Sequence, residues 1–261
     1  MTALKRTLAG LFLVASMTGC GNTAEETVVP VPQNIKIVSV GDSLTEGVGD
    51  STGSGGYVPY LERKLESLHE IKDVKFSNYG KKGNRTDQLL KEVQKDEMKA
   101  DIAEADIVMI TIGGNDVVKV VKENWSHLTI DNFEEEEAGY GKRIRAILAE
   151  IRKQNEDAGI VLVGIYNPFG KIFVETEDDE EIISSWNETG KLAAARFDRT
   201  TFVSIENIFS KGSEELFFED QFHPNDLGYK QIADRIFDTI KGEELEQLTN
   251  QKMVFTNEGS H

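Results

Sequence analysis

The chain of 261 residues contains one cysteine, Cys20, and far fewer basic than acidic residues. A single cysteine excludes an intramolecular disulfide. With 29 Lys and Arg against 46 Asp and Glu, the formal net charge is -17. Because phosphate binding draws on clustered Lys and Arg, this balance argues against a nucleic-acid partner. The 39% of hydrophobic residues is an ordinary globular content, and the length suffices for a sizeable core.

Long apolar runs are scarce as well, and no stretch reaches the length of a membrane-spanning helix. At the N-terminus, Lys5 and Arg6 precede an apolar run over residues 8–17, and Cys20 follows directly after the small residue Gly19. This arrangement is typical of a secretory signal peptide.

The segment 17–20, Met-Thr-Gly-Cys, resembles the lipobox of bacterial lipoproteins, with Met17 in place of the more usual leucine. The resemblance implies cleavage before Cys20 and a lipid on its sulfur, which would anchor the protein extracytoplasmically to the bacterial cell membrane. Residues 1–19 are then a signal peptide, and the polar, proline-containing segment 20–34 is a flexible tether. An ordinary signal peptide with an incidental thiol is the alternative.

Apolar, β-branched runs alternate with helical patterns over 35–241, which predicts one domain there. Strands are predicted at 35–41, 74–80, 105–114, 159–168 and 200–205. Helices are predicted at 57–70, 86–101, 140–157, 180–198 and 225–241. Strands that are apolar along their whole length are typical of a parallel sheet covered on both faces. The sequence therefore predicts an α/β fold, a three-layer α/β/α sandwich around a five-stranded parallel sheet.

Two stretches, 119–138 and 169–179, interrupt this alternation, and both follow strand ends, where α/β proteins bind ligands. They are interpreted as lids or side walls of a site, with acidic runs such as 134–137 as solvated loop. The tail 242–261 is polar and is expected to be frayed, with 252–255 as a candidate edge strand.

Residue types used in acyl transfer gather at the predicted strand ends. Ser43 follows the first strand, Gly83 the second and Asn115 the third, while Asp220 and His223 precede the last helix. Because the carboxyl ends of parallel strands share one edge of a sheet, these residues can converge although they are far apart in the chain.

Such a set has a definite chemistry. A serine hydroxyl is a weak nucleophile and needs a base, which His223 can supply near neutral pH. Asp220, three residues earlier, can hold the imidazole in the required tautomer. The developing oxyanion needs donors, and the amides of Ser43 and Gly83 and the side chain of Asn115 would supply three.

These blocks resemble the SGNH hydrolases, also called the GDSL esterase/lipase family. VGDSLTEG, NYGKKGNRT, IGGND and DQFHPN match the family's first, second, third and fifth blocks, within residues 37–229. The resemblance implies a flavodoxin-like sheet and hydrolysis of esters or thioesters without a metal or organic cofactor. The site residues that it implies are Ser43, Asp220 and His223 for the triad and Ser43, Gly83 and Asn115 for the oxyanion hole, with Gly80 as the less favoured register for the glycine.

Each block alone is weak, since Gly-Asp-Ser is common in turns and Ser43 by itself would be read as a helix cap. All four blocks in order, each at an expected strand end, favour the catalytic interpretation. Asp42 is expected to hydrogen-bond the turn, and Asn84 and Asp116 are interpreted as structural. The Gly-x-Ser-x-Gly elbow of the α/β-hydrolases is absent.

The sequence thus predicts a serine acyl hydrolase of the lipase, lysophospholipase or esterase type, acting on small-molecule or lipid esters. An O-acetylesterase of envelope carbohydrate or peptidoglycan is the alternative enzyme. A non-catalytic, envelope-binding lipoprotein is the alternative from another class. Acyl chain length, the leaving alcohol and the oligomeric state stay open.

Overall fold

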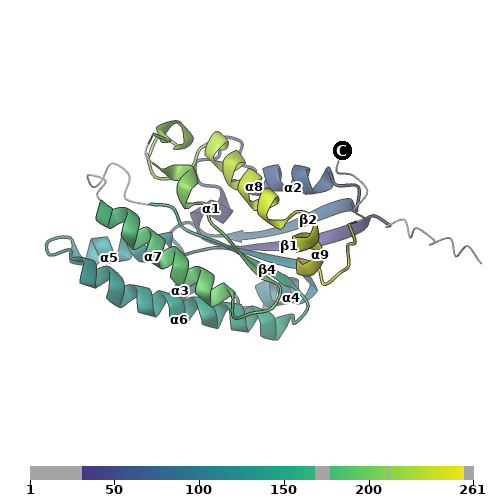
Figure 1. Ribbon diagram of the computed structural model, residues 1–261, viewed down its shortest axis with the longest axis horizontal. Coiled ribbons are helices and arrows are strands. Elements are labelled where there is room, and N and C mark those ends of the chain that lie inside the picture. The colour runs from purple at the N-terminus through teal and green to yellow at the C-terminus, as the bar shows by residue number, and fades with distance from the viewer. Residues whose placement is uncertain (1–30, 168–176, 211, 256–261) are drawn as a thin grey trace, which may run out of the picture.

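A parallel sheet of five strands lies at the centre of the computed structural model, which describes residues 31–167, 177–210 and 212–255 (Figure 1). The strand order is β2-β1-β3-β4-β5, and every neighbouring pair is parallel. This is the flavodoxin-like order, so the predicted fold class is confirmed. The strands are β1 (Gln33–Gly41), β2 (Ile71–Gly80), β3 (Ile107–Thr111), β4 (Gly159–Val163) and β5 (Thr200–Val203).

Helices cover both faces of the sheet, because successive strand side chains point to opposite sides. Val108 and Ile110 of β3 pack on one face, Ile107 and Met109 on the other, and all four are fully buried. The first face is covered by α3 (Thr86–Glu92), α4 (Asp96–Glu104), α5 (Gly114–Asn124), α6 (Ile130–Gln154) and α7 (Glu177–Ala194). The second is covered by α1 (Ser43–Glu46), α2 (Val58–Glu66), α8 (Asp226–Ile240) and α9 (Glu243–Leu248), with the short helices η1 (Glu206–Phe209) and η2 (Glu214–Leu216) beside them.

The stretch 119–138, for which the sequence suggested a lid or side wall, is mostly helical. It belongs mostly to α5 and to the first turns of α6, which begins at a capping box formed by Thr129 and Asn132. The acidic run 134–137 is helical rather than loop. Glu134 and Glu135 are exposed, whereas Glu136 pairs with Arg143 and Glu137 accepts from side chains of α7. The stretch predicted at 169–179 lies largely outside the described residues.

Two further boundaries differ from the prediction. The helix expected at 86–101 is divided into α3 and α4, with residues 93–95 between them. The tail is not frayed at its start, because α9 and Met253 pack on the sheet, with Leu245, Leu248 and Met253 almost completely buried. Residues 252–255 form no strand.

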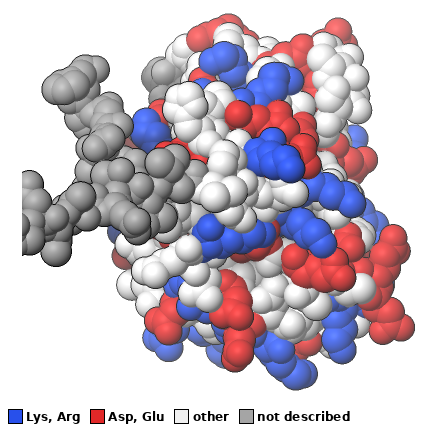
Figure 2. All heavy atoms as spheres, turned by 90° about the vertical axis from the view of Figure 1, so that its right-hand side faces the viewer, with Lys and Arg blue, Asp and Glu red and all other residues white. Residues whose placement is uncertain are grey.

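Figure 2 shows the end of the molecule at which β1 begins, which lies at the right in Figure 1. Lys and Arg side chains are interspersed there with Asp and Glu. Lys36 pairs with Glu104 at 2.7 Å and Lys252 with Asp106 at 2.8 Å. None of the helices in the described part of the chain is both long and apolar enough to span a bilayer.

Candidate active site

The turn that carries Ser43 depends on the glycine before it. Gly41 ends β1 with φ at 144°, and a Cβ there would lie 2.0 Å from the carbonyl oxygen of Thr111. Only glycine therefore lets β1 end this close to β3. Asp42 then caps α1, because its carboxylate accepts from the Leu44 amide at 3.1 Å, and the predicted turn role of Asp42 is confirmed. Ser43 follows as the first residue of α1, and the residue is 5% exposed.

The carboxyl group of Asp42 is itself buried. Burial raises its pKa to about 7, against the lowering effect of hydrogen bonds from the Leu44 amide and the Thr111 hydroxyl, the latter at 3.0 Å. Thr111 also pairs with Thr45 at 2.7 Å. A network of buried hydrogen bonds therefore holds the turn of Ser43 in place.

His223 and Asp220 lie in one tight turn before α8. The Nδ1 of His223 lies 2.6 Å from Oδ2 of Asp220, and Oδ1 of Asp220 accepts from the backbone amides of Phe222 and His223 at 3.0 and 2.9 Å. Burial pushes the pKa of Asp220 up, but these hydrogen bonds outweigh it and hold that pKa below its usual value. An ionised Asp220 keeps the proton on Nδ1 and leaves Nε2 as an acceptor, which is the tautomer that a general base needs.

Helix α8 joins this turn to the turn that carries Ser43. Asn225 caps α8 through the amides of Leu227 and Gly228, and its own amide donates to the carbonyls of Glu215 and Phe217. One turn further on, the hydroxyl of Tyr229 donates to the carbonyl of Val48 at 2.7 Å, just beyond α1. The two turns are therefore linked to each other through α8.

The predicted oxyanion donors come from the segments after β2 and β3. Asn115 lies in the first turn of α5, and its Nδ2 donates to the carbonyl of Asn84 at 3.0 Å. An amide nitrogen carries two hydrogens, so one remains for a substrate. Gly83 is exposed with φ at 78°, and a Cβ added there would meet nothing within 4 Å. Within the described part of the chain, the amides of Ser43 and Gly83 donate to no other group.

An ion pair between the buried Asp116 and the partly buried Arg143 connects these two segments. Asp116, next to Asn115, accepts from the amide and the hydroxyl of Thr86 at 3.0 and 2.5 Å. Arg143 of α6 donates to the same Thr86 hydroxyl at 2.6 Å and to Asp116 at 3.2 Å. Burial raises the pKa of Asp116, while the Thr86 hydrogen bonds and the Arg143 charge act in the opposite direction. The structural roles predicted for Asn84 and Asp116 are thus confirmed.

Ser43 and Asn115 line one small cavity, of about 30 Å³, at the carboxyl ends of β1, β3 and β4. Its other walls include Ile165, Tyr166 and Phe222. Gly83 and His223 do not line this cavity themselves. Asn84, the residue after Gly83, accepts a hydrogen bond from the lining residue Asn115, and Phe222, the residue before His223, lines the cavity.

Several residues that contribute to the site could not be recognised from the sequence. Tyr166 lies in the extended segment after β4, and its hydroxyl donates to the Phe222 carbonyl at 2.6 Å. Arg143 and Tyr229 read in sequence as ordinary members of amphipathic helices. Over 31–167, 177–210 and 212–255, no three His, Cys, Asp or Glu side chains come together as a metal site.

Comparisons with known proteins show the family of the chain. The model of the GDSL-like Lipase/Acylhydrolase family matches residues 39–231. The uncharacterized protein YpmR of Bacillus subtilis is 39% identical over 215 residues, which cover 82% of this chain and 84% of that protein. The spore germination lipase LipC of Bacillus licheniformis is 26% identical over 208 residues, which cover 77% and 94%.

Solved structures share the fold at lower identity. The lipase Lip_vut3 from goat rumen metagenome superposes with a TM-score of 0.70 at 23% identity, over 80% of this chain and 99% of that one. The acetylxylan esterase Axe2 of Geobacillus stearothermophilus gives a TM-score of 0.60 at 21% identity, over 83% and 98%. On the match over residues 39–231, the chain belongs to the GDSL-like lipase/acylhydrolase family of ester hydrolases.

Proposed function

We propose that this protein hydrolyses carboxylic esters with Ser43 as nucleophile, His223 as general base and Asp220 as the residue that orients the imidazole. The observation that carries the proposal is the 2.6 Å contact between Asp220 and the Nδ1 of His223, in a turn that α8 fixes to the turn of Ser43. Catalytic mutants of Axe2 at a serine, an aspartate and a histidine support the same assignment of residue types.

The reaction proceeds in two halves. In the first, Ser43 Oγ attacks the ester carbonyl while Nε2 of His223 takes its proton. The amides of Ser43 and Gly83 and the free N–H of Asn115 donate to the oxyanion that forms. The intermediate then collapses, and His223 returns the proton to the leaving alcohol. In the second half, water gives a proton to Nε2 of His223 and attacks the acyl carbon. The second intermediate collapses with cleavage of the bond to Ser43 Oγ, His223 returns the proton to that oxygen, and the carboxylic acid is released.

The acyl group is short. The cavity beside Ser43 measures about 30 Å³, and Tyr166 and Phe222 contribute to its walls. That volume favours an acetyl-sized group over a long alkyl chain, because a pocket that binds a larger ligand typically encloses about 300 Å³ or more. Of the predicted alternatives, the structure thus favours a short-chain esterase over a long-chain lipase.

The test is hydrolysis of p-nitrophenyl esters from acetyl to palmitoyl by wild type, Ser43→Ala and the matched control Ser67→Ala. Ser67 is an exposed serine at the end of α2, remote from the strand ends that carry the site. Activity should peak at the shortest acyl groups, persist in Ser67→Ala and vanish in Ser43→Ala. A fluorophosphonate probe should label the wild type and should not label Ser43→Ala. Retained activity in a folded Ser43→Ala variant, or no labelling of wild type, would refute the proposal.

We also propose that Cys20, which lies outside the described residues, carries a lipid that anchors the protein to the outer side of the cell membrane. The support is the lipobox-like segment 17–20 after an apolar run. In a bacterial host, wild type should incorporate radiolabelled palmitate and sediment with membranes. Cys20→Ala should do neither, and palmitate incorporation by that variant would exclude the assignment.

A further inference from the structure

Tyr166 is the largest side chain that lines the cavity of Ser43. It follows β4 at the carboxyl end of the strand and is 7% exposed. The other apolar side chains around the cavity are those of Leu44, Ile112, Ile165 and Phe222. Because the cavity measures only about 30 Å³, the bulk of its largest wall residue decides how much of an acyl group fits beside Ser43.

Contacts on three sides hold the Tyr166 side chain in place. Its hydroxyl donates to the carbonyl of Phe222 at 2.6 Å, and its ring packs on that of Phe209 with centroids 4.5 Å apart. The backbone of the preceding residue, Ile165, exchanges hydrogen bonds with the buried side chain of Asn187 at 2.8 and 2.9 Å. Because packing and hydrogen bonds fix the ring together, it does not swing aside to admit a longer substrate.

The surroundings of the Tyr166 ring are apolar. The ring centroid of Phe217 lies 6.1 Å from that of Tyr166, and the rings of Phe209 and Phe217 are 5.3 Å apart. A smaller residue at position 166 would therefore leave a space beside the Ser43 cavity that is bounded by phenyl rings. A methylene chain suits such a space, because it gains free energy on leaving water.

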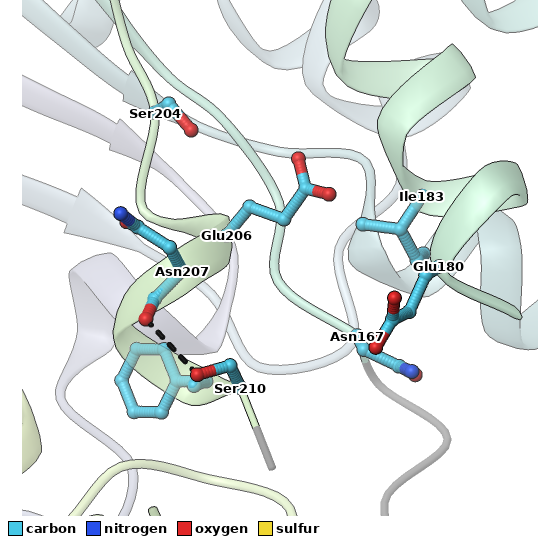
Figure 3. Close-up of a pocket in the computed structure, with 8 residues that line it drawn as sticks. Asn167, Glu180, Ile183, Ser204, Glu206, Asn207 and Ser210 are labelled. Atoms are coloured by element: carbon cyan, nitrogen blue, oxygen red, sulfur yellow. Dashed lines mark hydrogen bonds between the residues drawn. The ribbon is translucent and has the colours of Figure 1, made fainter. Parts of the chain in front are cut away.

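The space that the Tyr166 ring occupies is nevertheless limited. Phe209 also lines a separate pocket of about 380 Å³, into which Glu206 extends from η1 and Glu180 projects from α7 (Figure 3). Phe209 thus stands between the Tyr166 ring and a polar pocket. Covering the carboxylates of that pocket with hydrocarbon costs free energy, so a smaller residue at position 166 makes room for only a few more methylene groups.

We infer that Tyr166 determines the acyl chain length that this protein accepts, because its ring closes the Ser43 cavity at the size of a short acyl group. The inference rests on the proposed function, since it concerns the acyl group that Ser43 receives. Tyr166 is thus a specificity-determining residue. It takes no part in proton transfer, because its hydroxyl hydrogen is engaged by the Phe222 carbonyl.

The test is the ratio of kcat/KM for p-nitrophenyl hexanoate to kcat/KM for p-nitrophenyl acetate. In wild type this ratio should be well below one. Tyr166→Leu removes the ring but keeps an apolar side chain. It should raise the ratio about 10-fold or more, the usual effect of making room for extra methylene groups in an apolar pocket. p-Nitrophenyl palmitate should remain a poor substrate of this variant, because the freed space ends at Phe209.

Two controls separate acyl length from the hydroxyl group and from stability. Tyr166→Phe keeps the ring and loses only the hydrogen bond to the Phe222 carbonyl, so kcat should fall for both esters while their ratio equals that of wild type. Ile236→Ala is a large-to-small change at a fully buried position of α8, on the same face of the sheet, that does not line the cavity. Its melting temperature should fall, but its ratio should equal that of wild type.

Tyr166→Met replaces Tyr166→Leu if circular dichroism shows that the latter does not fold. Methionine fills irregular spaces in cores and its flexible side chain can move aside, so this variant should also raise the ratio. An unchanged ratio in the folded variant, or a wild-type ratio above one, would overturn the inference while leaving ester hydrolysis by Ser43 intact. Activity of Ser43→Ala toward p-nitrophenyl acetate would refute the proposed function itself, and the inference with it.

Discussion

The carboxyl group of Asp42 lies between helix α1 and strand β3, one residue before Ser43, and is 5% exposed. It accepts hydrogen bonds from the Leu44 amide and the Thr111 hydroxyl. Burial nevertheless raises its pKa from 3.8 to about 7, and the negative charge of Asp116 acts in the same direction. Between these two pH values the folded protein holds a proton that the unfolded chain has released.

This difference can be expressed as stability. Each pH unit between the folded and unfolded pKa corresponds to about 1.36 kcal/mol. The rise from 3.8 to about 7 is therefore equivalent to about 4 kcal/mol. Because the folded pKa is the higher one, this stabilisation is fully present below pH 3.8 and is lost as the pH rises through about 7.

The substitution Asp42→Asn isolates this effect. Asparagine keeps an oxygen for the Leu44 amide and the Thr111 hydroxyl and caps a helix as well as aspartate does. Its new NH₂ group is buried, and an unmatched donor costs about 1–3 kcal/mol. The variant should therefore be less stable than wild type by about 1–3 kcal/mol near pH 4 and more stable by a similar amount near pH 8.

Urea unfolding of both proteins at several values from about pH 4 to pH 8 measures this difference directly. Asp50→Asn is the control, because hydrogen bonds hold the pKa of Asp50 below its usual value despite partial burial. Its stability difference from wild type should be constant over that range. A constant difference for Asp42→Asn as well would refute the argument, since the buried carboxyl group would then titrate as in the unfolded chain.

Three other substitutions test the site. Asn115→Ala should lower kcat for p-nitrophenyl acetate by about 10²–10³-fold with little change in KM, because one oxyanion donor is lost; an unchanged kcat would remove Asn115 from the oxyanion hole. Arg143→Met leaves the buried Asp116 without its cation and should lower the melting temperature by about 5–15 °C, measured by circular dichroism; an equal or higher melting temperature would contradict this. Asp220→Asn should lower kcat on the order of 10⁴-fold. Because the folded pKa of Asp220 is lowered, its contribution to stability is present above pH 3.8, and the difference between this variant and wild type should shrink in unfolding experiments at lower pH.

The strands were predictable because each is a short apolar run with a strong β preference. Predicted and observed strands overlap at all five places, although β3 and β4 end several residues earlier than the apolar runs suggested. The apolar runs continue beyond the sheet because Ile112 after β3, and Ile165 and Tyr166 after β4, line the cavity at the strand ends.

The helices were less predictable where tertiary contacts, rather than local sequence, determine that a segment is helical. The sequence VVKVV in α5 has a β-branched composition, yet Val117, Val120 and Val121 follow helical spacing and pack on the sheet. The acidic first half of α6 has little apolar surface of its own, and its partners are Arg143 and side chains of α7, far along the chain. Short α9 has only two buried leucines, too few for a periodic signal.

The residues of the candidate site could be predicted from the sequence, but the residues that hold them in place could not. Ser43, Asn115, Asp220 and His223 stand in sequence blocks whose chemistry can be read directly. The residues that hold them, such as Arg143, Asn187 and Tyr229, bond to positions between 22 and 181 residues away. No local pattern encodes such partners, because they exist only once the layers have packed.

Strand β1 also determines how the molecule is oriented when it is attached through its N-terminal residues. Its nine residues run from the end shown in Figure 2 to the turn of Ser43, a distance of about 30 Å at about 3.3 Å per residue. An attachment through the residues before 31 therefore holds the protein at the end opposite the strand ends that carry Ser43. A protein immobilised in this way, on a resin or on a sensor chip, presents the cavity beside Ser43 outward to the medium. Coupling through Lys91 of α3, or through Lys81 and Lys82 after β2, would instead turn the same edge toward the support.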